Sequence, residues 1–145
     1  VSAQSDSIST ESDTSAVVKH HYLGLHAGIS TGVGFSYRYT KNKFGIQATG
    51  IPILNGGLVF GSAGLALTYR PLWKKTDDDD KFQLVLYTGG HYIVNEQLNA
   101  ALGFGFEKAF YDNFSFNLMV GYGLATSGSF YTIPSVETGI HYIIK

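Results

Sequence analysis

The side chains of this chain that could carry chemistry are few and lie far apart in the sequence. Histidine and glutamate can exchange protons or bind a metal ion, and arginine can pair with a carboxylate. Seven such residues fall on the polar side of the alternating segments described below: His26, Arg38, Arg70, His91, Glu107, Glu137 and His141. The chain contains no cysteine, which excludes disulfides, thiolate catalysis and cysteine-ligated metals.

A zinc or copper site is the first chemistry that the histidines suggest. If the first and last strands close a barrel, His26 and His141 should lie near each other at mid-depth. Zinc is held by three or four protein ligands, and only these two are placed there. His20 and His21, in KHHYL (19–23), fit an interfacial aromatic and basic anchor better than a metal site. We therefore predict no metal and no cofactor.

A hydrolytic site is the second possibility. His91 in GGHY could be combined with Glu137 and the nearby Ser135, but no local motif accompanies them, and a triad is defined by geometry rather than by sequence position. The segment GISTGVG (28–34) lacks the lysine and the strand-to-helix context of a phosphate-binding loop. We predict no catalytic residue and no enzyme activity.

Length and composition narrow the class of protein. A chain of 145 residues fits one domain. The formal net charge of -1 lacks the basic footprint of a nucleic-acid binder. Hydrophobic residues make up 44% of the chain and charged residues 14%. Even so, no window approaches the roughly 18 unbroken apolar residues of a membrane-spanning helix.

After Lys19, apolar residues recur at every second position. In the segment 100–107, for example, Ala100, Leu102, Phe104 and Phe106 alternate with Ala101, Gly103, Gly105 and Glu107. This period predicts strands that have one apolar and one polar face. Eight such segments occur: 22–30, 33–40, 44–49, 58–70, one beginning at Phe82, 100–107, 114–123 and 136–144.

The chemistry of the two faces separates a membrane protein from a soluble one. A soluble sheet carries Lys, Glu and Asp on its outer face, whereas here the polar face is mostly Gly, Ser, Thr, Asn and Gln, and lysine is absent from the strand interiors. Eight strands of about 9–11 residues are what a small transmembrane barrel requires. We predict an all-β fold over 20–145, an eight-stranded antiparallel up-and-down transmembrane β-barrel.

The alternative fold is a soluble, lipocalin-like barrel that binds an apolar ligand. Its apolar rows would face inward, and Arg38, Arg70 and Glu107 would face water.

The interior of a transmembrane barrel of this size is just wide enough for its own side chains. Inward glycines would make room for the larger Tyr87 and His91, although some glycines could instead mark bulges; the candidates are Gly103, Gly105, Gly121, Gly123 and Gly139. Because charges in a dry interior must be paired, the seven ionisable residues predict a polar network that plugs the barrel. A narrow pore or proton-linked gate is the alternative.

The first 19 residues differ from the rest of the chain. From Ser5 to Ser15 nearly all residues are Ser, Thr, Asp or Glu, a composition that predicts disorder. The opening VSAQ is similar to the end of a secretory signal peptide cleaved near Ala3–Gln4, as in exported proteins of Bacteroidota. We therefore expect a signal-peptide remnant and a disordered leader over 1–19.

The final strand carries a family resemblance. In ETGIHYIIK, Glu137, Gly139, Tyr142 and Ile144 match the polar, glycine, aromatic and hydrophobic positions of the assembly signal that ends bacterial outer-membrane barrels. The chain thus resembles small outer-membrane β-barrel proteins of the Bacteroidota type. The resemblance implies recognition by the barrel-assembly machinery and a place among the lipids of the Gram-negative outer membrane. It also implies a structural or accessory role in the cell envelope; a lipid-modifying enzyme on such a barrel is less expected.

With both termini in the periplasm, charge gathers at the periplasmic end. There KKTDDDDKF (74–82) should form a solvated hairpin, in which Asp77–Asp80 make a poor Ca²⁺ site and Trp73 is an interface anchor. The opposite connections, 30–32, 50–57, 92–99 and 125–134, are nearly uncharged. We expect an envelope protein partner at that outer end, within a larger complex.

Overall fold

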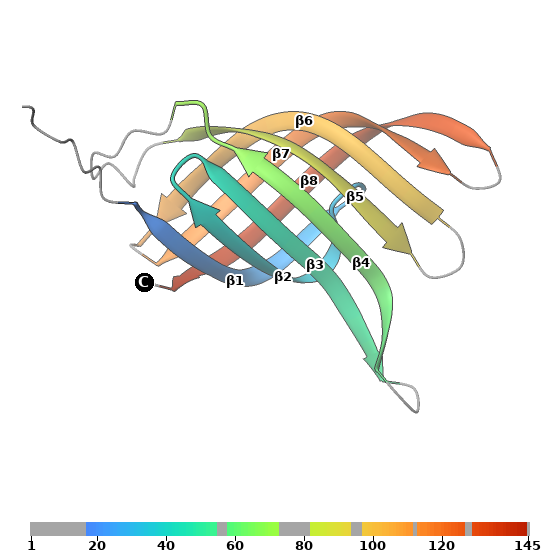
Figure 1. Ribbon diagram of the computed structural model, residues 1–145, viewed down its shortest axis with the longest axis horizontal. Coiled ribbons are helices and arrows are strands. Elements are labelled where there is room, and N and C mark those ends of the chain that lie inside the picture. Colours follow the sequence, from blue (N-terminus) through green and yellow to red (C-terminus); the bar gives the residue numbers. More distant parts are fainter. Residues whose placement is uncertain are drawn as a thin grey trace, which may run out of the picture.

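Residues 17–54, 58–72, 82–93, 97–111, 113–126 and 129–144 are described by the computed structural model. Over these ranges eight strands close into one barrel, each antiparallel to its neighbours in sequence order (Figure 1). The strands are β1 (Lys19–Gly28), β2 (Gly32–Lys41), β3 (Phe44–Leu54), β4 (Leu58–Tyr69), β5 (Gln83–Ile93), β6 (Gln97–Phe110), β7 (Phe114–Thr126) and β8 (Phe130–Ile144). The predicted eight-stranded antiparallel up-and-down barrel is confirmed. The described ranges contain no helix that is long and apolar enough to cross a membrane.

Pairing of the first strand with the last closes the barrel. β1 pairs with β8 from His21↔Ile144 to Gly28↔Glu137. The start of β1 and the end of β8 therefore lie side by side at one end of the barrel (Figure 1), which we call the terminal end. The opposite end, where the β1–β2 and β3–β4 hairpins turn, is the loop end.

The apolar faces of the strands point outward. Leu102 is 69% exposed and Phe35 is 65% exposed, while the neighbouring Ser36 is buried. The four largest fully buried side chains are polar: Arg38, His141, Gln47 and Glu137. A small apolar cluster inside the barrel joins Val85, Tyr87 and Met119. The distribution is the reverse of that in a water-soluble barrel, whose apolar side chains face inward.

Aromatic rings form a belt around the outside of the terminal end, which we call the aromatic girdle. Each of the four hairpin pairs of strands contributes at least one ring contact, and in the four pairs named next the centroids are 5.0 to 6.5 Å apart. The pairs are His21–Tyr39, Phe44–Tyr69, Phe82–Phe106 and Phe114–Tyr142. Pairing of neighbouring strands brings the two rings of each pair together, and the closed barrel arranges the four pairs around its terminal end.

Several strands are longer than the sequence indicated, and two of them continue through a proline. β3 continues through Pro52 and β8 through Pro134, where the sequence predicted connections. Pairing of β2 with β3 stops at Gly50, and pairing of β1 with β8 stops at Glu137. Both prolines therefore lie where their strand has one neighbour, and an edge position tolerates the missing N–H.

The β3–β4 hairpin extends beyond the barrel wall at the loop end (Figure 1). Past Gly50 and Ser62 its two strands pair with each other but no longer with β2 or β5. A register shift between Ile51 and Pro52 marks the point where the hairpin leaves the wall.

Some sequence predictions fall outside the described residues. These are the disordered leader up to residue 16, the interface anchor Trp73 and the aspartate run Asp77–Asp80.

Candidate functional site

Two groups of polar side chains in the interior of the barrel contain six of the seven ionisable residues named from the sequence. The first, which we call the arginine cluster, consists of Arg38, Gln47, Arg70, Glu107 and His141. Glu107 accepts hydrogen bonds from the Nη1 of Arg38 and, at 2.8 Å, from the Nη2 of Arg70. The Nε of Arg38 donates to Gln47 Oε1 at 3.0 Å. One carboxylate thus links two guanidinium groups that come from β2 and from the end of β4.

His141 is held in one protonation form by this cluster. Arg38 Nη2 lies 3.2 Å from His141 Nδ1, and because a guanidinium only donates, Nδ1 must accept. The proton of the neutral ring is then on Nε2, which donates to Ser36 Oγ at 3.2 Å. Both ring nitrogens are occupied, so His141 is unavailable to a metal ion.

The second group, the glutamate cluster, consists of His26, Ser30, Thr31, Ser135 and Glu137. Glu137 is fully buried. Its carboxylate accepts bonds from Ser30 N at 3.0 Å, from Ser30 Oγ and Ser135 Oγ at 2.5 Å each, and from Thr31 Oγ1. His26 Nε2 donates to Thr31 Oγ1 at 2.6 Å and lies 3.3 Å from Glu137 Oε2. Such a set of donors satisfies a buried carboxylate without a bound cation.

The charges of the two clusters balance. Arg38 and Arg70 carry two positive charges, and Glu107 and Glu137 carry two negative ones. The ring of Tyr22 lies 5.4 Å from the guanidinium carbon of Arg38 and 5.9 Å from that of Arg70, a geometry that attracts a cation to the ring face. Each of these four buried charges has hydrogen-bonding partners inside the barrel, as buried charges require.

The turn between β1 and β2 folds into the barrel. Ser30 and Thr31 are each 1% exposed although they lie in a turn. On one side Glu137 of β8 binds them, as described above. On the other side His91 Nδ1 donates to Ile29 O at 3.3 Å, and Ser62 Oγ lies within 3.5 Å of both the N and the O of Val33. We call residues 29–33 the inward turn; it crosses the interior and is held from opposite walls.

The inward turn fits because the wall opposite it has a glycine, Gly64, at the point of close approach. A Cβ atom added to Gly64 would collide with the backbone carbonyl of Thr31. Gly32 has φ +93°, a left-handed conformation that residues with a side chain rarely adopt. The sequence pattern predicts that 30–32 is an outer connection, and it does not identify Ser30, Thr31 and Ser62 as partners of the ionisable residues. The signal for the turn was present in the glycine at its end and in the inward Gly64.

All seven ionisable residues named from the sequence lie inside the barrel, in three places. Arg38, Arg70, Glu107 and His141 form the arginine cluster, His26 and Glu137 belong to the glutamate cluster, and His91 lies beside the inward turn. The rings of His26 and His141 are 6.1 Å apart. A Cβ atom on Gly139 would lie 2.7 Å from His26 Nδ1 and 2.8 Å from His141 Cε1, so this glycine makes room for both rings.

The predicted use of glycines to accommodate Tyr87 agrees with the geometry at two positions. Added Cβ atoms would lie 2.7 Å from Tyr87 Cε1 at Gly103 and 2.6 Å from Tyr87 OH at Gly121. His91 instead lies against Gly32, at 3.2 Å from the corresponding Cβ position.

Hydrolytic chemistry would need His91 and Glu137 to act together. His91 Nε2 is 2.7 Å from Ser62 Oγ, but its Nδ1 faces the Ile29 carbonyl and no carboxylate. Glu137 binds the inward turn and His26. In the part of the chain that the structure describes, no group of three or more metal-ligating side chains is present. The hydrogen bonds of these residues are made with one another and with the inward turn.

The fold and the interior define a class of closed β-barrel with an apolar outside and a charged, hydrogen-bonded inside. Comparisons with protein-family models, curated proteins and solved structures give no match to this chain.

Proposed function

We propose that this chain is a small outer-membrane β-barrel protein with a structural or accessory role in the Gram-negative envelope. The observation that carries the proposal is the outward position of the apolar rows. Side chains such as Phe104 and Ile140 are more than half exposed, while Arg38 and Glu137 are buried. An outer surface of this kind is suited to contact with the hydrocarbon of a lipid bilayer.

The aromatic girdle supports the same proposal. Transmembrane barrels carry rings of aromatic residues where the hydrocarbon meets the headgroups. Here one aromatic pair from each of the four strand hairpins lies at the terminal end. The terminal end then lies at a membrane interface, which we assign to the periplasmic side.

The soluble, ligand-binding alternative is less well supported. A lipocalin-like barrel needs an apolar cavity inside. In this chain the interior contains the arginine and glutamate clusters and the inward turn. Two hollows of about 590 and 440 Å³ are lined mostly by outward residues such as Leu23, Phe35 and Ile140. Arg38 and Glu107, which would face water in that alternative, are buried.

The interior of the barrel supports a plugged barrel rather than a pore. The arginine cluster and the inward turn lie at different depths, and each reaches across from one wall to another. We therefore propose a barrel that is closed to ions and solutes.

The last strand supports delivery by the barrel-assembly machinery. Tyr142 and Ile144 are exposed on the outer face of β8, and Glu137 and Gly139 face inward.

A partner at the loop end is supported by the projecting β3–β4 hairpin, whose outer backbone edges are unpaired beyond Gly50 and Ser62. Unpaired edges accept an additional strand.

The test of the proposed function is refolding from urea into detergent and into lipid vesicles. A transmembrane barrel should migrate differently on a gel before and after boiling, and protease should spare its strands in vesicles. A chain that is monodisperse and folded in plain buffer without detergent would overturn the proposal. Its recovery as a folded monomer from mild detergent, with no co-purifying protein, would count against the partner alone.

A further inference from the structure

Three lysines gather on the outside of the terminal end. Lys19 of β1 and Lys41 of β2 are direct cross-strand partners, both are exposed, and Lys43 is exposed in the turn that follows. Lys19 lies two residues from the outward His21, and Lys41 two residues from Tyr39, so both lysines share the outer face. Like charges placed directly opposite each other destabilise a sheet, which raises the question of what compensates them.

The backbone holds these lysines together. Asn42 N donates to Val18 O at 3.0 Å, and Val18 N donates to Asn42 Oδ1 at 3.1 Å. These two bonds fasten the residue before Lys19 to the turn between Lys41 and Lys43. The three lysines, which we call the lysine rim, are therefore fixed next to one another before any ligand arrives.

The described part of the chain supplies no counter-charge to the lysine rim. It contains two carboxylates, Glu107 and Glu137, and both are buried inside the barrel and bound there. Lys108, on the outside of β6, differs from the rim because its Nζ lies 5.1 Å from the ring of Phe82. Among the described residues, the rim thus has no carboxylate partner, and it lies at the edge of an apolar wall.

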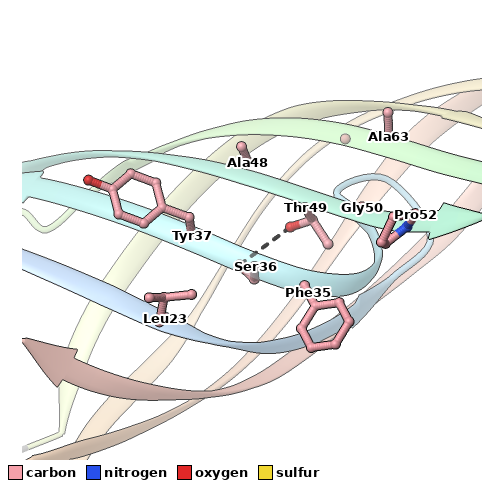
Figure 2. A pocket seen from close by; sticks show the side chains of 10 residues that line it. Leu23, Phe35, Ser36, Tyr37, Ala48, Thr49, Gly50, Pro52 and Ala63 are labelled. Atoms are coloured by element: carbon pink, nitrogen blue, oxygen red, sulfur yellow. Dashed lines mark hydrogen bonds between the residues drawn. The ribbon is translucent and has the colours of Figure 1, made fainter. Parts of the chain in front are cut away.

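A hollow in the outer wall lies on the loop-end side of the lysine rim. It has a volume of about 590 Å³ and spans β1 to β4. Figure 2 shows the larger side chains Leu23, Tyr37 and Phe35 along one side and the short Ala48 and Ala63 on the other. Tyr37 is four residues from Lys41, which is about 13 Å along a strand. The Tyr37 hydroxyl is 2.7 Å from His21 Nδ1, so the end of the hollow nearest the rim is polar and the rest is apolar.

We propose that the lysine rim and this hollow form a binding site for one anionic phospholipid. The phosphate of the headgroup would pair with Lys19 and Lys41, and one acyl chain would lie in the hollow over Ala48 and Ala63. This site rests on the proposed function, because it needs the outer wall to face lipid. A phospholipid joins an anionic headgroup to hydrocarbon, as this site joins cations to an apolar hollow.

Charge favours a phospholipid over a second copy of the chain in the hollow. The described outer wall of another copy offers no carboxylate to the lysine rim, because Glu107 and Glu137 point inward. A phosphate ion alone would satisfy the rim but leave the hollow without a partner.

Native mass spectrometry of the detergent-solubilised full chain tests the site. The protein is mixed with equal amounts of phosphatidylglycerol and phosphatidylcholine, and the retained lipid is identified by mass. The wild type should retain one phosphatidylglycerol in preference to phosphatidylcholine. Each substitution, Lys19→Gln or Lys41→Gln, should lower that retention about fivefold. A basic residue near a membrane surface contributes about 1 kcal/mol to binding, which is about fivefold in affinity.

Two further variants separate charge from shape. Ala63→Leu fills the hollow without touching the lysines and should lower retention of phosphatidylglycerol as well. Lys108→Gln removes an outward lysine on β6, away from the hollow, and should leave retention unchanged. Inorganic phosphate at the same concentration as the lipid should not displace it.

The outcomes distinguish this site from the proposed function. Equal retention of both lipids by a heat-modifiable barrel would overturn the site while leaving the membrane assignment intact. So would an equal effect of Lys108→Gln, displacement by inorganic phosphate, or a dimer that Ala63→Leu dissociates. A chain that is folded and monodisperse in plain buffer without detergent would overturn both proposals together.

Discussion

Glu107 on β6 joins Arg38 on β2 to Arg70 at the end of β4, across the interior of the barrel. These residues are far apart in sequence, and the three charges are almost completely buried. The carboxylate is the shared partner of both guanidinium groups, so the stability of this layer depends on one side chain.

Replacing Glu107 with glutamine should destabilise the barrel strongly. The substitution keeps the shape but leaves two buried guanidinium groups without their carboxylate, and breaking a buried pair costs about 3–5 kcal/mol. Urea unfolding in detergent, followed by tryptophan fluorescence and by gel migration, measures the loss. Lys108→Gln, on the outside of the same strand, is the control and should change stability by less than about 0.5 kcal/mol. Equal effects of the two substitutions would show that the interior pairing is not what stabilises the wall.

Gly64→Ala should push the inward turn away from its position. Alanine usually stabilises a strand relative to glycine, but here the added Cβ would meet the carbonyl of Thr31. We expect a loss of about 1–3 kcal/mol, as for other overpacked sites. Gly90→Ala is a matched control on β5, because its added Cβ has nothing nearer than Asn99 O at 3.6 Å.

A thiol probe reports the position of the turn directly. Because the chain has no cysteine, Ser30→Cys introduces a single reactive group. It should react slowly with a maleimide in the otherwise unchanged barrel and faster when combined with Gly64→Ala. Fast labelling of Ser30→Cys alone, with the barrel still heat-modifiable, would contradict the inward position of the turn. A serine on the exposed side of the loop end, Ser129→Cys, gives the rate for an accessible site.

The closed interior predicts that the protein conducts no ions. Reconstituted into planar bilayers, the wild type should give no stable conductance steps, because the two charged clusters and the inward turn fill the cross-section. Liposome swelling in small sugars should be equally absent. Steady steps of uniform size from the purified barrel would be incompatible with a plugged interior.

Tyr142→Ala should reduce assembly in cells more than it reduces stability in detergent. Tyr142 occupies the aromatic position of the assembly signal and packs against Phe114 at 5.3 Å. The amount of heat-modifiable protein in isolated outer membranes, compared with the yield of refolding in vitro, separates the two effects. Tyr122→Ala removes an exposed tyrosine from β7 and should behave alike in both assays. A parallel fall in both measurements for Tyr142→Ala would argue for a packing role only.

The sequence was sufficient to predict the strands and their two faces, because a period of two residues assigns each side chain to one side of a sheet. That rule placed Arg38, Glu107 and Glu137 on the inner face. It could not predict which of them would pair, since the Arg38–Glu107 contact depends on how far the strands are staggered around the barrel.

The inward turn was beyond what local patterns could predict. Short polar segments such as 30–32 usually lie on the surface, and the burial of this one depends on Gly64 and Glu137, both distant in sequence. The lengths of β3 and β8 were underestimated because Pro52 and Pro134 ordinarily mark strand ends. Only the pairing register shows that each proline lies on an unpaired edge.

The hydrogen bonds from the inward turn to Glu137 also affect the order in which the barrel folds. The bond from Ser30 N to Glu137 joins residues 107 positions apart, so the β1–β2 hairpin receives this interior partner from β8, the last strand of the barrel in sequence order. Contacts of such long range form slowly because the chain entropy of the intervening loop is lost first. The N-terminal hairpin should therefore stay open to solvent until β8 arrives, and closing the wall and burying the turn should occur as a single late event.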